Sequence, residues 1–313
     1  EKGIVLAKSI SAKKFGIVTG EPIANALQKC PNILIVPPEH GYYNEQSHKL
    51  MNLLRTFTPD IEQVSVDECY MDFSGIQNEY PSPLACAYKI KDTVKEKLGF
   101  TVNVGISDVK VLAKMASDFE KPDKIHTLWK DEIEDKMWPL KVSELLMVGK
   151  RSIPKLDKMG IRTIGDLAKE DKTRIVNAFG KFGKMIWEYA NGIDETPVNY
   201  LVEKPKGIGN SVTLSTDYNS LENLNKVLLE LTEQVTYRLR AENMLANVVN
   251  VQIKTKDFRV FSHQRKMEFS TASTKIIYEE ARKLISELYK TGTYVRLIGI
   301  RVDAVSYTHL RAH

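Results

Sequence analysis

Strands and helices alternate in the last third of the chain, and this order constrains its fold more than any other feature of the sequence. Apolar residues recur there either at every second position, as in a strand, or at the spacing of a helix face. The predicted elements are a strand at 209–216, a helix at 221–243, strands at 247–256 and 259–269, a helix at 272–290 and a strand at 295–305. A β-α-β-β-α-β order is typical of a compact split-βαβ domain.

The stretch before this domain has a different character. Residues 141–200 show little strand periodicity, and glycines interrupt several short helical patterns. We therefore expect a small all-helical domain there. The run at 198–207, which contains Pro205 and Gly207, is typical of an extended linker between the two domains.

The first 138 residues mix short strands with helices. The predicted elements are a strand at 4–7, a helix starting near Pro22, a strand at 33–38, a helix at 43–57, strands at 61–66 and 69–75, a helix at 82–99, a strand at 100–107 and a helix at 108–121. The strands within 61–75 are close enough in sequence to predict a hairpin. Together with the C-terminal domain, this pattern indicates a multidomain protein of the α+β class.

Two neighbouring carboxylates, Asp67 and Glu68, interrupt the predicted hairpin. In a regular strand neighbouring side chains point to opposite faces, so both reach one ion only if the chain bends between the strands. Such a bend would let their oxygens converge, and magnesium prefers hard oxygen ligands together with water and substrate phosphates. The simpler alternative is a polar turn, which is the commoner explanation for an acidic pair taken alone.

Composition narrows the class of protein. Of the 313 residues, 42% are apolar and 27% are charged, as in an ordinary globular protein, and no apolar run is long enough to span a bilayer. The three cysteines are too few and too scattered for a disulfide frame or a zinc site, which favours a reducing cytoplasm. The net charge of +5 permits a polyanionic partner without requiring one.

The two ends of the sequence are unusual. The chain starts at Glu1 without a Met, and residues 4–6 already have the character of an interior strand. The tail SYTHLRAH, at 306–313, follows a strand pattern and matches nothing expected after it. We expect a non-native tail, and further residues of the natural protein upstream of Glu1.

Two sequence strings point to one family. EQVSVDECYMDFSG resembles the palm motif S-[IV]-D-E-x-[YF]-x-D of the Y-family, or translesion, DNA polymerases, and NVGISDVKVLAKMASDFEKPD resembles the strand and helix that follow that motif in the family. The resemblance extends from Ile4 to about Val305 and implies a right-hand polymerase. Its parts would be fingers at 1–39, a palm at 40–138, a helix-hairpin-helix thumb at 139–199, a linker at 200–207 and a little finger at 208–305.

The resemblance implies roles for individual palm residues. Asp67 and Glu68 match the family's catalytic, metal-binding carboxylates, which implies two Mg²⁺ ions that assist in-line nucleotidyl transfer. Lys121 matches a lysine that contacts the incoming triphosphate. Lys110 and Lys114, on the same predicted helix, are expected to be solvated or to face DNA.

The N-terminal region departs from the family pattern. A further metal-binding aspartate belongs upstream of Glu1, so residues 1–313 alone are expected to be nearly inactive. KSISAKKFG stands in the place of the family's Y-E-A-R-K-F-G. Lys13 replaces an arginine that grips the triphosphate, and it keeps the charge but loses the bidentate geometry. Ile10 replaces a tyrosine and cannot make its hydrogen bond to the nucleotide.

Glycine-rich hairpins in the helical region are candidate DNA contacts. LLMVGKRSIPKL and AFGKFGKMI resemble helix-hairpin-helix elements, whose exposed backbone N–H groups bind phosphate without reading sequence. The candidate residues are Gly149 in the first and Gly180 and Gly183 in the second. Met147 stands where the first hairpin would carry another glycine.

Basic residues on two strands of the last domain are further candidate DNA contacts. Alternation would place a subset of them on one face of the sheet, where they could follow phosphates. A solvated face is the alternative, and the resemblance favours DNA contact. The candidates are Lys254, Lys256, Arg259, Arg265 and Lys266.

The resulting hypothesis is a DNA-directed DNA polymerase of the translesion type, which adds deoxynucleotides to a primer 3′ end. A non-catalytic homologue that grips duplex DNA through thumb and little finger is the alternative, and a metal-dependent nuclease would leave Lys121 unexplained. The implied partners are primer-template DNA and deoxynucleoside triphosphates, with sliding-clamp binding through a C-terminal peptide absent from this sequence. We expect a monomer without membrane association, in the cytoplasm at the nucleoid.

Overall fold

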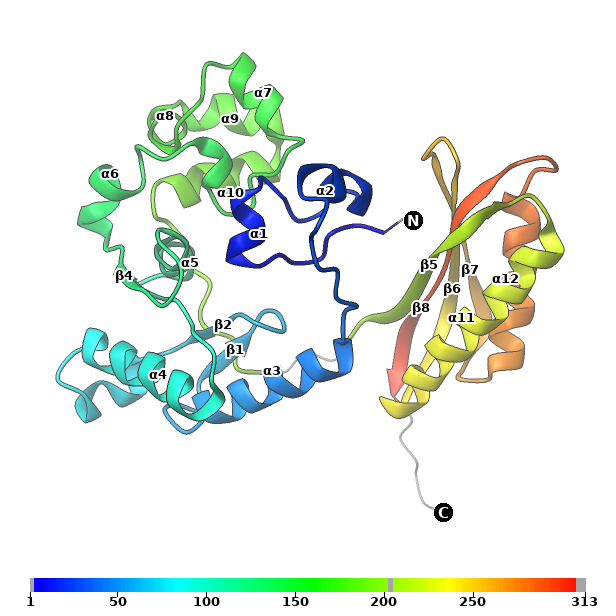
Figure 1. Ribbon diagram of the computed structural model, residues 1–313, viewed down its shortest axis with the longest axis horizontal. Helices are drawn as coiled ribbons and strands as arrows, with labels where there is room; N and C mark the ends of the chain where they lie inside the picture. Colours follow the sequence, from blue (N-terminus) through cyan, green and yellow to red (C-terminus); the bar gives the residue numbers. More distant parts are fainter. Residues whose placement is uncertain (1–2, 202–204, 308–313) are drawn as a thin grey trace. The chain divides into compact units, whose positions relative to one another are not determined.

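A computed structural model describes residues 3–201 and 205–307, with only the backbone for 304–307 (Figure 1). The chain divides into two compact units: Glu39–Val202 is one, and Glu1–Pro38 together with Glu203–His313 is the other. Each unit contains helices, and sheets occur in both. This mixture confirms the predicted α+β class.

The first part of the unit Glu39–Val202 packs two helices on a short hairpin. Its elements are α3 (His40–Leu54), β1 (Ile61–Gln63), β2 (Cys69–Met71), the 3₁₀ helix η1 (Ser74–Glu79) and α4 (Pro83–Leu98). The two strands are antiparallel, as predicted. Ser82 accepts a hydrogen bond from the first turn of α4, and Gly99 ends that helix in the left-handed conformation that favours glycine. Apolar residues of both helices and of β1 form one core cluster.

The next part places a helix against two parallel strands. β3 (Val104–Ile106) pairs with β4 (Ile125–Thr127), a strand that the sequence pattern had not indicated, and α5 (Lys110–Asp118) connects them. The helix lies so close to β3 that a Cβ atom on Gly105 would stand 1.9 Å from the carbonyl oxygen of Ala113. Glycine at 105 is therefore required by the close approach of the two backbones.

Short helices follow, and those within residues 141–200 were predicted. They are η2 (Lys130–Glu132), α6 (Ile133–Lys136), η3 (Val142–Glu144), α7 (Ile153–Lys158), α8 (Ile164–Lys169), α9 (Lys172–Phe179) and α10 (Lys181–Ala190). Their buried residues share one hydrophobic cluster with Val111, Leu112 and Met115 of α5. One face of α5 is thus anchored in the helical region, and its other face is left for polar side chains.

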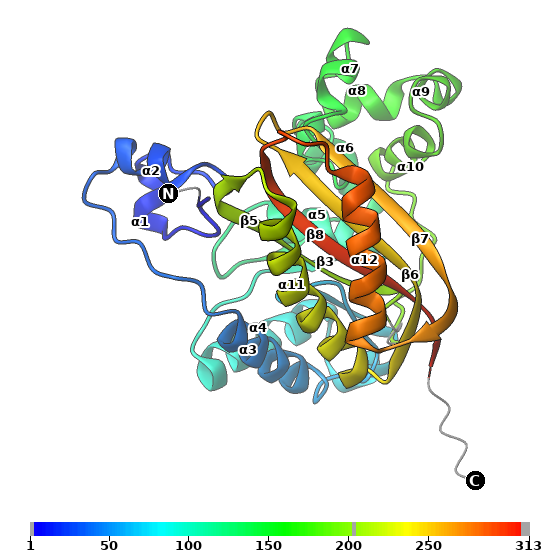
Figure 2. The ribbon, with the colours of Figure 1, turned by 90° about the vertical axis from the view of Figure 1, so that its right-hand side faces the viewer.

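The last domain has the predicted β-α-β-β-α-β order. Its elements are β5 (Gly207–Tyr218), α11 (Leu221–Ala241), β6 (Met244–Thr255), β7 (Val260–Thr271), α12 (Thr274–Leu288) and β8 (Val295–Tyr307). The strands form an antiparallel sheet in the order β5-β8-β6-β7. Both helices cover the same face of this sheet (Figure 2).

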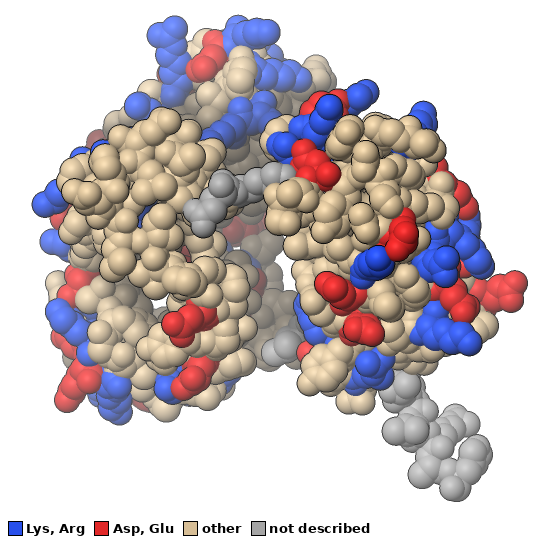
Figure 3. Space-filling view, turned by 45° about the vertical axis from the view of Figure 1, so that its right-hand side comes forward, with Lys and Arg blue, Asp and Glu red and all other residues tan. Residues whose placement is uncertain are grey.

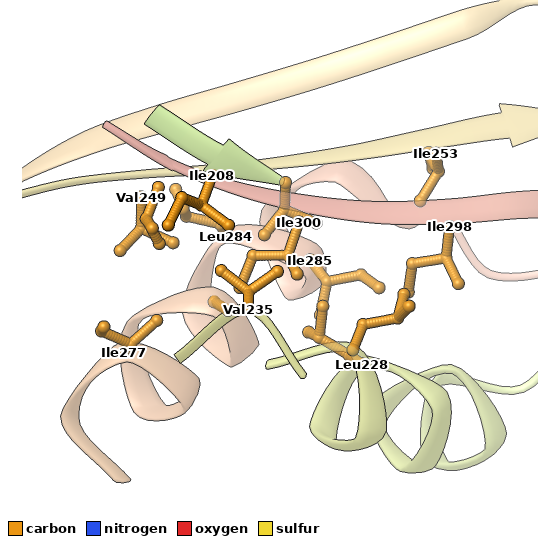
Figure 4. Packing of buried hydrophobic residues seen from close by; sticks show 14 of the residues in the cluster. Ile208, Leu228, Val235, Val249, Ile253, Ile277, Leu284, Ile285, Ile298 and Ile300 are labelled. Atoms are coloured by element: carbon orange, nitrogen blue, oxygen red, sulfur yellow. The ribbon is translucent and has the colours of Figure 1, made fainter. Parts of the chain in front are cut away.

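The core of this domain lies between the sheet and its two helices. Side chains from β5, β6 and β8, such as Ile208, Val249 and Ile300, meet Leu228 of α11 and Leu284 of α12, and all are at most 3% exposed (Figure 4). Burial of this many large apolar side chains, each worth about 1.5–3 kcal/mol, stabilises the sheet in its observed register.

The N-terminal segment differs from its predicted structure. It contains two helices, α1 (Ile10–Lys14) and α2 (Ile23–Lys29), and the predicted strand at 4–7 is reduced to a single bridge between Ile4 and Pro22. The predicted strand at 33–38 is wrong, because those residues have no pairing partner and no regular structure. A β-branched apolar run forms a strand only where a neighbouring strand accepts its hydrogen bonds.

The predicted linker and tail lie partly outside the described residues. Positions 202–204 and 308–313 are among those not described. Within the described ranges, no helix combines the length and the apolar character needed to cross a membrane.

Candidate active site

The two neighbouring carboxylates lie in the turn between β1 and β2. The chain bends there because the N–H groups of Val64 and Ser65 both donate to the carbonyl of Glu68, at 3.0 and 3.2 Å. The hydroxyl of Ser65 also donates to Oδ1 of Asp67 at 2.7 Å. Asp67 and Glu68 are exposed, and about half of the Glu68 side chain (46%) is accessible. The predicted bend is therefore present, and both carboxylates are accessible to a ligand from solvent.

A chain of charged side chains runs from this turn along α5. Nζ of Lys114 lies 2.8 Å from Oε1 of Glu68 and 2.9 Å from Oδ2 of Asp118. The other carboxylate oxygen of Asp118 accepts from Nζ of Lys121 at 2.7 Å. Charges thus alternate in sign from Glu68, a candidate metal ligand, to Lys121, the candidate triphosphate lysine.

The pKa values within this chain follow from its contacts. Burial disfavours the charge of Lys114, but its hydrogen bonds to Glu68 and Asp118 outweigh that cost and raise the pKa of Lys114. Burial likewise works to raise the pKa of Asp118, but the bonds from Lys121 and Lys114 prevail and lower it. Both groups are therefore charged at neutral pH, and the chain of alternating charges persists there.

A second lysine of α5 ties the helix to the end of the helical region. Nζ of Lys110 contacts Oε2 of Glu62 at 2.7 Å and the carbonyl of Pro197 at 3.0 Å, and it lies over the ring of Tyr70. The N–H of Asn199 donates to the same oxygen of Glu62 at 2.7 Å. These contacts join α5, the hairpin strand β1 and residues 197–199 within one unit.

Of the two expectations for Lys110 and Lys114, a solvated side chain is therefore wrong, and DNA contact stays a prediction. Their side chains are only 16% and 20% exposed, and each ammonium group contacts a carboxylate of the hairpin. Asp118 was missed by the sequence argument. Its spacing from Lys114 (i, i+4) and from Lys121 (i, i+3) is the signal that could have found it, because such residues are neighbours on one helix face.

The donor chemistry of the hairpin fits a hard divalent cation in part. Asp67 and Glu68 offer exposed carboxylate oxygens, the ligand type that Mg²⁺ prefers, and Mg²⁺ keeps several water or phosphate ligands beside protein carboxylates. Across residues 3–201 and 205–307, no cluster of three or more His, Cys, Asp or Glu side chains is placed to hold a metal ion. The pair therefore fits as part of a coordination shell.

The candidate substrate residue of the N-terminal segment lies in α1. Lys13 is in the last turn of this helix, and Ser9 accepts a hydrogen bond from the N–H of Ala12 at its start. Ile10, which stands where the family has a tyrosine, is 67% exposed. The role of Lys13 at a triphosphate stays a prediction.

The first glycine-rich hairpin has an unusual backbone. Met147 has φ +73°, in the left-handed region that favours glycine, and its side chain is 60% exposed. Methionine thus occupies the position of the missing glycine while keeping a glycine-like conformation, at a cost of about 1–2 kcal/mol. Gly149, before α7, is exposed and has open space where a Cβ would stand.

In the second hairpin, glycine stands at the two positions for different structural reasons. Gly180 joins α9 to α10 with φ +65°, and it is exposed. Gly183 is buried, and a Cβ there would lie 2.4 Å from the carbonyl oxygen of Ile175 in α9. The glycine at 183 is thus explained by helix packing, and phosphate contact at these three glycines stays a prediction.

This helical region is strongly basic. Residues 150–184 contain ten Lys and Arg against four Asp and Glu. Figure 3 shows Lys and Arg side chains gathered at the top of the view, where Figure 1 places α7 and α9. A local excess of positive charge attracts a polyanion and complements the predicted phosphate contacts of the hairpins.

The candidate cations of the last domain divide between the two faces of the sheet. Lys254 belongs to the row of β6 that alternates with the buried Val251 and Ile253, so it lies on the face without helices. Lys266 pairs with Val248 of that same row and shares this face. Lys254 and Lys266 therefore both lie on the open face of the sheet, which the two helices do not cover.

The remaining candidates have other surroundings. Arg265 pairs across the strands with the buried Val249 and is thus on the helix side, where its guanidinium contacts Glu280 and Glu287 of α12 at 2.7 and 2.6 Å. The structure does not bring it together with the lysines of the open face. Of the other two, Lys256 lies over the ring of Tyr294 and Arg259 is paired with Asp257.

Comparison with known proteins matches the chain over almost its whole length. The impB/mucB/samB family model matches residues 1–118, and the model of that family's C-terminal domain matches residues 205–309. DNA polymerase IV of Clostridium acetobutylicum is 46% identical over 303 residues, which are 97% of this chain and 76% of the relative. The chain belongs to the Y-family of DNA polymerases. DNA polymerase IV of Alkaliphilus oremlandii is 39% identical, over 98% of this chain and 77% of the relative.

Solved structures support the same family. A Y-family DNA polymerase chimera of Dbh and Dpo4 superimposes with a TM-score of 0.87 at 25% identity, covering 96% of this chain and 87% of that one. An insertion ternary complex of Dbh DNA polymerase matches with a TM-score of 0.64 at 25% identity, over 98% and 89% of the two chains. The predicted family and multidomain polymerase fold are thus confirmed.

Membership of the family decides between the hypotheses. The chain is a DNA-directed DNA polymerase of the translesion type, a nucleotidyltransferase, and its partners are DNA and deoxynucleotides. A non-catalytic DNA-binding homologue is not favoured, because the relatives matched over nearly the whole chain are named as polymerases. Y-family polymerases use divalent metal ions.

Proposed function

We propose that the turn between β1 and β2 is the catalytic centre of this polymerase, with Asp67 and Glu68 as ligands of two Mg²⁺ ions. The observation that carries this proposal is the alternating charge chain, which links Glu68 through Lys114 and Asp118 to Lys121. It connects one of the two exposed carboxylates, Glu68, with a lysine that is 54% exposed and able to meet a phosphate. Such a pairing suits a nucleoside triphosphate that arrives with its metal ion.

Each residue of this centre has a distinct task. When bound, the two ions would stabilise the negative charge on the attacking primer oxygen and on the leaving pyrophosphate. Asp67 and Glu68 supply anionic oxygens, and Ser65 orients Asp67 by its hydrogen bond. Lys121 offsets charge on the triphosphate, and a triphosphate contact of Lys13 is proposed from the resemblance alone. Catalysis in this class depends chiefly on positioning and electrostatic stabilisation.

The remaining parts serve to hold DNA. We infer a thumb at 139–199, whose hairpins at Gly149, Gly180 and Gly183 offer N–H groups to the phosphates of a duplex. The little finger at 208–305 follows a linker at 200–207 and offers the open face of its sheet, with Lys254 and Lys266. Residues 1–39 form the fingers and 40–138 the palm.

The substrate also bears on the cellular location of the polymerase and on its protein partners. Primer-template DNA of a bacterial chromosome lies at the nucleoid in the cytoplasm, and we place the protein there. We further propose that it acts as a monomer, and that a C-terminal peptide absent from this sequence binds the sliding clamp. Such tethering would raise its local concentration at primer ends without a new contact in the active site.

Lys121→Ala is expected to raise the KM for the incoming deoxynucleotide about tenfold, because a charge-assisted contact to phosphate is worth roughly 1.5–3 kcal/mol. Steady-state primer extension by the full-length protein, at saturating DNA, measures this value. Lys124→Ala is the matched control, since Lys124 is similarly exposed (49%) and is paired with Glu120. An unchanged KM in Lys121→Ala would remove this lysine from the proposed site.

Changing both Lys254 and Lys266 to Gln is expected to weaken DNA binding about tenfold, equally for unrelated sequences. The slope of log K against log salt should become shallower by about 1.8, since each phosphate contact contributes roughly 0.9. Fluorescence anisotropy of a labelled duplex across a salt series measures both. The control changes Lys226 and Lys283, which lie on the two helices, to Gln. An effect of equal size in the control would show only that net charge matters.

A further inference from the structure

Lys114 holds one of the two carboxylates of the proposed metal site. Its ammonium group lies 2.8 Å from Oε1 of Glu68, and its side chain is only 20% exposed. We propose that Lys114 is a positioning residue that holds one carboxylate oxygen of Glu68, leaves the other oxygen for a divalent cation, and thereby sets the cation affinity of the hairpin. This inference rests on the proposed function, because it takes Glu68 as a metal ligand.

The backbone keeps Lys114 in place while Glu68 stays adjustable. α5 is anchored by apolar residues of its other face, among them Leu112 and Met115, and by Gly105, which lets the helix lie directly on β3. Glu68 instead belongs to an exposed turn. A side chain on a rigid helix can therefore fix the rotamer of a carboxylate on a short loop.

The charges around Lys114 explain why one lysine has two acidic partners. It is shared between Glu68 and Asp118, and Asp118 is also paired with Lys121. The carboxylates of Glu68 and Asp118 and the two ammonium groups balance to zero, so that only the charge of Asp67 is left over beside them. The ammonium also occupies one oxygen of Glu68 and leaves the other for a metal ion.

Removal of the Lys114 ammonium group is expected to have opposite effects on two quantities: the affinity for a divalent cation rises, and the rate of turnover falls. Without Lys114, Glu68 and Asp118 lose their shared counter-charge, so the hairpin attracts a divalent cation more strongly. The same change frees the Glu68 side chain from its observed orientation, so the rate of catalysis falls. Loss of a residue with only a structural role would lower both the cation affinity and the rate of catalysis.

The test is a titration of Mn²⁺, followed by EPR, into the full-length protein without DNA or nucleotide. Lys114→Met keeps the length of the side chain and is expected to bind Mn²⁺ about fivefold more tightly at low salt, while kcat for primer extension falls about tenfold. Lys114→Arg keeps the charge and should bind as the wild type does. Lys226→Met, which removes an exposed lysine paired with Glu222, is the matched control and should change neither value.

Salt separates electrostatics from a loss of structure. As the salt concentration rises from about 0.05 to 0.5 M, the Debye length shortens from roughly 14 to 4 Å. The ratio of the Mn²⁺ affinity of Lys114→Met to that of the wild type should therefore fall toward one. Equal or weaker Mn²⁺ binding by Lys114→Met at low salt would overturn the inference. Glu68→Gln tests the underlying assignment separately: if it binds Mn²⁺ as the wild type does, the proposed metal site itself fails.

Discussion

Asp67→Asn and Glu68→Gln are each expected to lower kcat for primer extension about 10³-fold, the largest effect of any change considered for this polymerase. Both variants keep the size and shape of the side chain, remove its charge and replace one acceptor oxygen by an NH2 donor. The loss follows because the carboxylates supply the anionic oxygens that hold the catalytic cations, and groups that act as one unit lose most of their effect when any one is removed. Single-nucleotide incorporation by the full-length protein in Mg²⁺ measures the rate.

Folding should be unaffected in both variants. The two side chains are exposed in a turn, so the free energy of unfolding should stay within about 0.5 kcal/mol of the wild type. Glu45→Gln is the matched control for Glu68→Gln, because Glu45 is also exposed and is also paired with one lysine, at 2.7 Å. If either active-site variant incorporates nucleotides at the wild-type rate, the assignment of the hairpin as catalytic centre is wrong.

The fold of the last domain was predictable because its signals are local. Periods of two and of 3.6 residues alternate there over long segments, and each predicted strand and helix has a counterpart in the structure. The run at 33–38 misled because its apolar, β-branched composition indicates a strand, while strand pairing depends on a partner distant in sequence. β4, of three residues, was too short to show a period.

The active site was predictable only in part, for the same reason. The carboxylate pair and the bend that carries it could be read from residues 61–75 alone. The contact between Lys114 and Glu68 joins positions 46 apart in sequence. The helix pattern alone therefore could not show that Lys114 is largely buried and paired with a carboxylate. The face of Arg265 likewise depended on the register of β7 against β6, since a shift by one residue exchanges the two faces.

Gly105→Ala is expected to destabilise the unit Glu39–Val202 by about 3 kcal/mol or more. A Cβ at this position would lie 1.9 Å from the carbonyl oxygen of Ala113 and 2.6 Å from the amide nitrogen of Ser117. Both are backbone atoms of α5, so no side chain can rotate away, and the whole helix has to move from β3. Because α5 carries Lys114 and Asp118, the variant should also lose turnover through misplacement of the charge chain.

Tryptophan fluorescence during urea unfolding reports this effect selectively. All three tryptophans of the chain, at 129, 138 and 187, lie in the unit Glu39–Val202, and the last two pack against the cluster that anchors α5. The matched control is Gly41→Ala in α3, where a Cβ meets no atom within 4 Å. That change should raise stability by about 0.5–1 kcal/mol, since alanine is the better helix former. Equal unfolding midpoints for Gly105→Ala and the wild type would mean that strand and helix separate at little cost, and the rigid support proposed for Lys114 would be lost with them.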